Sequence, residues 1–190
     1  FGISKIRDSK LRKALYRMPG AKSTSSWKAN ARGVDLNRNY KYNYHAKYGG
    51  RRGGSGYSGP YAESEPETKA VVKLINTLKN NTKLKGTVNY HAMGSIAFGS
   101  VRRGIKKTTK KTTIKMYNLA RRITGYASSA SYEKGGKSVG ALREYTMYNK
   151  KVPSITLEIG VGGCPLPSSQ FGSVWRRNYS LVIREARLLG

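Results

Sequence analysis

The sequence has little of what builds a disulfide framework or a cysteine-rich metal cluster. Among its 190 residues there are one cysteine and two histidines. The single cysteine, Cys164, cannot form a disulfide within the chain, and no group of cysteines is available as metal ligands. These counts exclude an internally disulfide-bonded fold and a zinc-finger type of cluster.

Acidic residues are also scarce. The chain has 9 Asp and Glu against 37 Lys and Arg, which gives a formal net charge of +28. Such a charge attracts polyanions, whether nucleic acid, anionic lipid or acidic cell-wall polymer, although a solvated basic surface is the simpler interpretation. No RRM, zinc-finger or helix-turn-helix signature is present, and the 14 tyrosines are scattered rather than spaced as a stacking platform. We therefore expect no specific nucleic acid partner and keep a general polyanion binder as an alternative.

Long apolar runs are missing as well. No run approaches the ~20 residues of a membrane-spanning helix, so we expect no membrane span. Hydrophobic residues at 37% and aromatic residues at 10% nevertheless exclude a disordered chain. The length predicts one domain over residues 1–190 with a sizeable core. Because the chain has neither an initiator Met nor a charged-then-apolar leader, we expect a processed or excised piece of a longer protein.

Hydrophobic periodicity predicts helices that alternate with short strands. Apolar residues recur at helical spacing over residues 65–79 and 109–124, and over 171–189 they predict one long C-terminal helix. Residues 86–91 alternate like a strand, and residues 152–159 have the branched side chains of a buried strand. This order predicts an α/β fold with a mixed, largely parallel sheet flanked by helices.

Polar residues lie at the ends of three predicted strands. An apolar strand at 33–36 leads into Asn-Arg-Asn at 37–39, the second strand ends at His91, and the third carries Glu158. Functional groups gather where the strands of open α/β sheets end. A histidine closing a strand is more often structural than a ligand, whereas a glutamate in an apolar strand needs a cation, a metal-bound water or a reacting proton. Together these residues predict a carboxylate-binding arginine, a metal-ligand histidine and a general base, the groups that hydrolyse an amide beside a free carboxylate.

Four segments carry a resemblance to a known family. GVDLNRNY (33–40), SGPYAESEPET (58–68), the strand that ends at His91 and PSITLEIG (153–160) occur in the order found in the zinc carboxypeptidases. The chain resembles that family over roughly residues 25–190, which implies the C-terminal two thirds of the family fold. The variant WKANARGVDLNRN is more similar to the bacterial branch that cleaves γ-D-glutamyl–diamino acid bonds in peptidoglycan than to the digestive enzymes.

The resemblance implies a role for each matching position. His91 would be a zinc ligand, and Glu158 would be the general base that deprotonates the metal-bound water. Asn37 and Arg38 would bind the terminal carboxylate of a peptide substrate. Lys28 takes the place of the usual arginine that polarises the scissile carbonyl, keeping its charge but not its planar fork.

Three further positions follow from the same resemblance. Arg32 is a nearby substitute for Lys28 as the group that polarises the carbonyl. Tyr132 matches the family's mobile-loop tyrosine if the loop that carries it is shifted relative to an ungapped count. Arg143 falls at the position that reads the substrate side chain, and its charge would favour an acidic or carboxylate-bearing side chain such as that of diaminopimelate.

The chain departs from the family at the metal site. The first two zinc ligands of the family come from an HxxE motif, whereas the sequence that starts at His45 is HAKY. The resemblance implies one zinc ion. Because a catalytic zinc needs three protein ligands, we expect that ion to be absent from this chain or weakly held by it. The sequence therefore predicts an inactive piece of a secreted or wall-associated bacterial metallopeptidase that docks on anionic wall polymer, or alternatively a non-catalytic carboxylate- or wall-binding relative.

Overall fold

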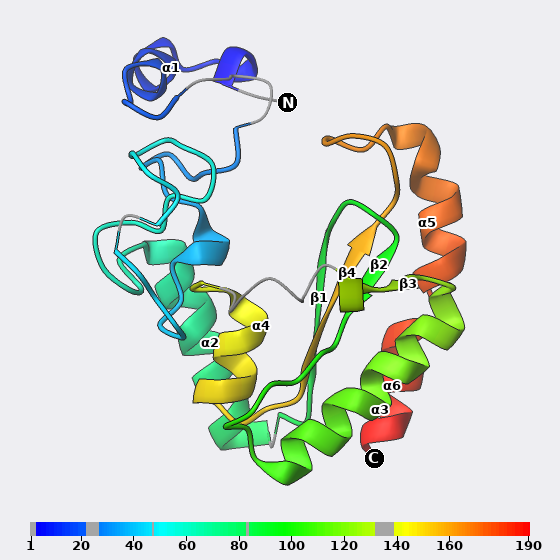
Figure 1. Ribbon diagram of the computed structural model, residues 1–190. Helices are drawn as coiled ribbons and strands as arrows, with labels where there is room; N and C mark the ends of the chain where they lie inside the picture. Colours follow the sequence, from blue (N-terminus) through cyan, green and yellow to red (C-terminus); the bar gives the residue numbers. More distant parts are fainter. Residues whose placement is uncertain (1–2, 22–26, 47, 83, 132–138) are drawn as a thin grey trace. The chain divides into compact units, whose positions relative to one another are not determined.

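The computed structural model describes residues 3–21, 27–46, 48–82, 84–131 and 139–190 (Figure 1). Contacts within the chain divide it into two compact units. The first comprises Phe1–Thr82 and Lys137–Tyr145, and the second comprises Lys83–Gly136 and Thr146–Gly190. The single domain expected over residues 1–190 stays a prediction.

The first unit is built from helices and ordered turns. Its helical elements are η1 (Ile3–Lys5), α1 (Ser9–Tyr16), η2 (Leu36–Arg38), α2 (Pro66–Thr82) and α4 (Leu142–Glu144). Helix α2 confirms the helix predicted for residues 65–79, and it starts at Pro66, whose fixed φ suits the first helical position. Between η2 and α2, residues 41–60 form turns without helix or strand in their described part.

The strand predicted for residues 33–36 is wrong. Gly33 has a φ of +78°, which an extended strand does not allow, and residues 36–38 form the 3₁₀ helix η2. Two short polar side chains impose this path: Asn30 Oδ1 accepts from Val34 N at 3.1 Å, and Asp35 Oδ1 accepts from Asn37 N at 3.1 Å. Such side-chain bonds to the nearby backbone compete with strand formation, so turn chemistry outweighed the apolar alternation.

The second unit contains a four-stranded sheet in the order β1-β4-β2-β3. Its strands are β1 (Thr87–Ala92), β2 (Ile96–Phe98), β3 (Ala127–Ser128) and β4 (Ser154–Ile159). β1 pairs with β4 in parallel, β2 pairs with β3 in parallel, and β2 pairs with β4 antiparallel. The mixed, mostly parallel sheet confirms the predicted α/β class, and β1 and β4 confirm the two predicted strands.

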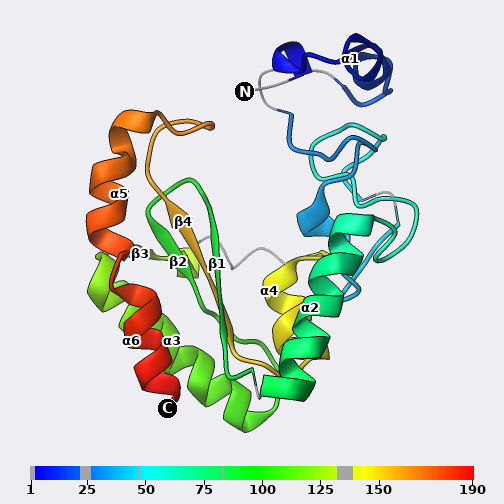
Figure 2. The ribbon, with the colours of Figure 1, turned by 180° about the vertical axis from the view of Figure 1, so that it is seen from behind.

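Helices of the second unit lie along one side of this sheet, as Figures 1 and 2 both show. They are α3 (Lys107–Thr124), α5 (Phe171–Asn178) and α6 (Leu181–Leu189), with the short turns η3 (Ser129–Ser131), η5 (Tyr145–Asn149, π-helical) and η6 (Ser168–Gln170) in the connections. Strand and helix residues form one buried core, made of Ala97, Met116, Ala120, Tyr126, Ile155, Leu157 and Leu181.

The prediction of a single long C-terminal helix over residues 171–189 is wrong. It is divided into α5 and α6 at residues 179–180, and its apolar face is not the buried one. Phe171 and Trp175 are 68% and 58% exposed, whereas Asn178 and Glu185 are buried. Asn178 Nδ2 donates to the Tyr126 hydroxyl at 2.8 Å, and this contact turns a polar side of α5 inward.

Within the described ranges, no helix combines the length and the apolar composition that crossing a bilayer requires.

Candidate functional site

His91 and Glu158 lie side by side on neighbouring strands of the second unit. His91 of β1 and Glu158 of β4 are register partners in a parallel pair. Partners in register project from the same face of a sheet, with strands about 4.8 Å apart. Both residues are half-buried. The structure therefore brings together the two strand-end residues that the sequence singled out, separated by 67 positions in the chain.

The face that carries His91 and Glu158 is polar. Along these two strands, Ile155 and Leu157 point into the core, and the alternating residues point to the other face. On that face Thr87 Oγ1 donates to Ser154 Oγ at 2.7 Å, and Asn89 Nδ2 donates to the same oxygen at 3.0 Å. Glu158 thus belongs to the polar face and is not the fully buried carboxylate that the apolar strand suggested.

Gly94 leaves room beside the Glu158 side chain. Its φ is +148°, and a Cβ placed there would lie 3.9 Å from Glu158 Cβ and 2.9 Å from Ile96 Cδ1. The Gly94 amide donates to the Gly160 carbonyl at 2.8 Å, so the turn after β1 is fixed against the end of β4. A side chain at this position would clash with Ile96 and would only touch Glu158.

A complete zinc site is not formed by the residues that the structure describes. A catalytic zinc takes three protein ligands and a water or substrate. His91 and Glu158 adjoin, but the described ranges contain no group of three His, Cys, Asp or Glu side chains able to hold a metal ion. His45 is exposed and lies in the first unit. The donor set present here does not by itself fit a resident zinc ion.

Asn37 and Arg38 lie in the 3₁₀ helix η2 of the first unit. Asn37 Oδ1 accepts from Leu142 N at 3.0 Å, and Arg38 Nη1 donates to the Asn37 carbonyl at 2.7 Å. Gly140 packs so tightly that a Cβ on it would lie 1.9 Å from the Arg38 carbonyl oxygen. The segment that leads into α4 is therefore fixed against η2, and both residues keep half-exposed side chains.

Arg143, the predicted side-chain reader, is part of this same neighbourhood. It is 8% exposed, and its Nη2 lies 2.6 Å from Glu144 Oε1, with Nε at 2.9 Å from the same oxygen. The Glu144 carboxylate offsets the charge of the Arg143 guanidinium. The sequence had suggested that this charge binds an acidic side chain of the substrate. Nothing in the residue spacing signalled this pair, because adjacent residues do not ordinarily share one face of a helix.

Two buried tyrosines, Tyr40 and Tyr145, contact each other in the first unit. The rings of Tyr40 and Tyr145 lie 5.6 Å apart. Burial raises the pKa of Tyr40 to about 12 and the pKa of Tyr145 to about 12, so both hydroxyls stay protonated at neutral pH. Tyr132, the predicted mobile-loop tyrosine, lies outside the described residues.

Lys28 and Arg32 each approach a buried carboxylate of the first unit. Lys28 Nζ lies 3.9 Å from Asp35 Oδ2, and Arg32 Nε lies 3.5 Å from Glu65 Oε2. Both cationic side chains are 59% exposed, whereas the Asp35 and Glu65 side chains are 4% and 0% exposed. Both cations are thus ion-pair partners of a buried carboxylate, and the pair of Lys28 is the longer of the two.

The sequence reasoning missed the residues that fasten the turn to helix α2. Asn39 is fully buried, and its Nδ2 donates to Ser58 O at 2.8 Å and to Ser64 Oγ at 3.0 Å. Glu65 accepts from Asn30 Nδ2 at 2.8 Å and from Ser64 Oγ at 2.7 Å. Asn39 therefore acts as a structural residue, unlike its neighbours in the Asn-Arg-Asn sequence.

The chain belongs to the zinc carboxypeptidase family, whose sequence profile matches residues 9–181. It is 23% identical over 162 residues to gamma-D-glutamyl-L-diamino acid endopeptidase 1 of Lysinibacillus sphaericus, covering 84% of this chain and 38% of that protein. The family predicted from the four sequence segments is confirmed.

Solved structures show the same fold. Bovine thrombin-activatable fibrinolysis inhibitor, in complex with tick carboxypeptidase inhibitor, superposes with a TM-score of 0.65 at 21% identity, covering 82% of this chain and 56% of that one. Murein-tripeptide amidase MpaA from Escherichia coli O157 gives a TM-score of 0.53 at 20% identity, with 85% and 61% covered. The chain thus spans between about two fifths and three fifths of the length of these relatives.

Proposed function

We propose that this protein is a zinc-dependent peptidase that hydrolyses an amide bond next to a free carboxylate in peptidoglycan peptides. The family match supports peptidase chemistry. Two relatives point to the substrate class, because one is named for γ-D-glutamyl–diamino acid bonds and the other for a murein tripeptide. The observation that carries the proposal is the register pairing of His91 with Glu158 on one polar face.

Each residue is assigned the role that the resemblance to the family implies. Glu158 accepts the proton of the attacking water and returns it to the leaving amine, as a general acid–base group does. Asn37 and Arg38 bind the terminal carboxylate of the substrate through amide and guanidinium donors. Lys28, or Arg32 in its place, supplies a positive charge to the carbonyl oxygen of the scissile bond, and Arg143 contacts the substrate side chain.

Zinc, which the family name implies, has one ligand in this assignment, His91. The described part of the chain provides no three-ligand group, so no catalytic step is assigned to the metal here. Metal content is instead a direct measurement on the protein, and a stoichiometry near one zinc per chain would require ligands beyond His91.

A hydrolysis assay tests the proposal. The protein is incubated with zinc and a γ-D-glutamyl-diaminopimelate peptide, and products are identified by mass spectrometry; no product from the unaltered chain would mean the inactive piece that the sequence predicts. Glu158→Gln should lower kcat by about 100-fold or more, because general acid–base groups contribute ~10²–10⁴-fold. Glu67→Gln, the same change at an exposed glutamate of α2, should leave kcat unaltered. Full activity in Glu158→Gln would refute the role of Glu158.

A second function is favoured by the metal-ligand set, because the described residues hold no three-ligand group. A relative without hydrolytic activity would still use Asn37 and Arg38 to bind a carboxylate, for example in wall peptides. The same peptide then binds without cleavage, even with zinc supplied in excess. Binding that Arg38→Met abolishes, in the absence of any product, would establish this second function in place of the first.

Secretion and wall association complete the proposal. A net charge of +28 attracts the anionic polymers of a bacterial cell wall, and this attraction weakens with salt. Cosedimentation with purified walls should therefore decrease as ionic strength rises. Retention that is independent of salt would contradict an electrostatic attachment.

A further inference from the structure

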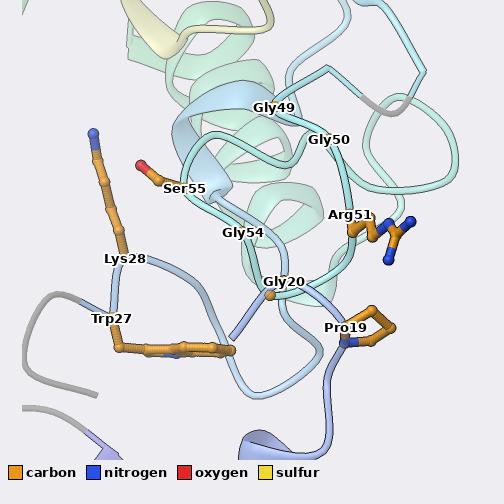
Figure 3. A pocket seen from close by; sticks show the side chains of 10 residues that line it. Pro19, Gly20, Trp27, Lys28, Gly49, Gly50, Arg51, Gly54 and Ser55 are labelled. Atoms are coloured by element: carbon orange, nitrogen blue, oxygen red, sulfur yellow. The ribbon is translucent and has the colours of Figure 1, made fainter. Parts of the chain in front are cut away.

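A pocket in the first unit is formed by a glycine-rich loop over Trp27. Residues 49–55 lie against residues 19–20 and 27–28, and they enclose a cavity of about 490 Å³ (Figure 3). Cavities that hold small ligands usually measure about 300–1,000 Å³. The loop is the middle of residues 41–60, the segment of turns between η2 and α2.

Backbone contacts fix the shape of this loop. Gly20 N donates to Arg52 O at 2.8 Å, and Gly53 N donates to Gly33 O at 2.9 Å. A Cβ on Gly20 would lie 2.3 Å from Gly54 N, so the two chain segments touch at a distance that only glycine permits. The wall of the pocket that the glycines form is therefore made of main chain.

The side chains that line the pocket combine an aromatic plane with polar groups. Figure 3 shows the Trp27 indole edge-on below Gly20 and Gly54, with Lys28 and Ser55 on the same side of the ring plane. Arg51 lies on the opposite rim and its guanidinium points away from Lys28. Among the described lining residues no side chain is acidic.

The Lys28 ammonium is available to a ligand. Lys28 Nζ forms an ion pair with Asp35 Oδ2 at 3.9 Å, which is beyond hydrogen-bond distance. An ammonium has three donors, so Lys28 can interact with buried Asp35 on one side and donate to an anion on the other. Asp35 at the same time holds the lysine over this end of the pocket.

We propose that this pocket binds a pyranose ring that carries a carboxylate. The weakly positive C–H face of the ring packs on the negative face of the Trp27 indole, the carboxylate accepts from Lys28, and a ring hydroxyl or acyl oxygen contacts Ser55. The inference rests on the proposed function in one respect: a wall hydrolase meets muramic acid, whose carboxylate is free to accept from Lys28 only where no peptide is attached to it. An acidic polysaccharide would present the same chemistry.

Tryptophan fluorescence measures the binding directly. The chain has two tryptophans, and Trp175→Phe removes the exposed one in α5 so that Trp27 alone reports. The probes are N-acetylmuramic acid and glucuronic acid, each compared with its neutral counterpart, N-acetylglucosamine or glucose. D-lactate serves as a carboxylate without a ring. Both sugar acids should change the Trp27 emission at lower concentration than their counterparts, and the tighter of the two identifies the source.

Matched lysine variants test the carboxylate contact. In Lys28→Met the acid should bind about three- to tenfold more weakly, so that the ratio between acid and neutral sugar approaches one, as expected for one partly exposed charge-assisted hydrogen bond. Lys69→Met makes the same change at an exposed position of α2 and should keep the ratio. Trp27→Leu, followed by calorimetry, should weaken the acidic and neutral sugars alike.

Three results would overturn the proposal. They are equal binding of acidic and neutral sugars, an equal loss in Lys28→Met and Lys69→Met, and binding of D-lactate as tight as that of N-acetylmuramic acid. Because these measurements involve no hydrolysis, sugar binding without peptidase activity would refute the proposed function alone. Peptidase activity without sugar binding would refute this inference alone.

Discussion

Replacing Glu185 with glutamine should remove a pH-dependent cost to the stability of the second unit. Glu185 of α6 is 2% exposed, and neither carboxylate oxygen has a hydrogen-bond partner within the described part of the chain. Burial raises the pKa of Glu185 from 4.5 to about 7. Since one pKa unit corresponds to about 1.4 kcal/mol, ionising this group in the folded state costs about 3 kcal/mol.

The sign follows from which state holds the proton more tightly. The folded state, with the higher pKa, binds the Glu185 proton more strongly than the unfolded chain does. Below about pH 4.5 the carboxyl is protonated in both states and costs no stability. The free energy of unfolding falls as pH rises from about 4.5 through about 7. Glutamine stays neutral throughout and lacks this dependence.

Urea unfolding at pH 4.5 and pH 8 provides the assay. The difference between Glu185→Gln and the unaltered protein should shift by about 3 kcal/mol in favour of the variant between the two conditions. Any cost of burying an amide is the same at both values of pH and cancels. Glu67→Gln, an exposed control, should show no comparable shift. A difference that stays constant within about 0.5 kcal/mol would refute the reasoning.

Three further predictions concern the first unit. Asn39→Ala should lower the free energy of unfolding by about 3 kcal/mol in urea titrations, because a fully buried amide loses its bonds to Ser58 and Ser64; a loss under 1 kcal/mol would contradict this. Arg143→Leu should reduce the kcat/KM preference for acidic over neutral substrate side chains, and an unchanged preference would remove Arg143 from specificity. Asp8→Ala should cost about 1 kcal/mol by circular dichroism melts, since Asp8 caps α1.

The elements that the sequence predicted well are those whose pattern and packing agree. Strands β1 and β4 alternate or carry branched residues, and the chain can satisfy this pattern only with one face in a core. Residues His91 and Glu158 could thus be assigned to strand ends from the sequence alone. Their exact pairing in register could not, because register depends on which strands meet and on the turns between them.

The predictions that failed involve polar side chains with specific partners. Asn30 and Asp35 bond to the backbone two to four residues ahead and turn the chain where alternation suggested a strand. Asn178 pairs with Tyr126, far away in sequence, and moves the buried side of the C-terminal helices. Such contacts depend on three-dimensional neighbours, which hydrophobic periodicity does not contain.

The core and the candidate catalytic face are opposite sides of the same strand, and this links stability to the site. Leu157 is fully buried next to Glu158, and side chains alternate across a strand. The packing of Leu157 against the helices therefore decides that Glu158 points to the face that carries His91. A slip of one residue in β4 would place the carboxylate in the apolar core, where its desolvation is costly. The hydrophobic contacts behind the sheet thus act as positioning elements for the two residues in front of it.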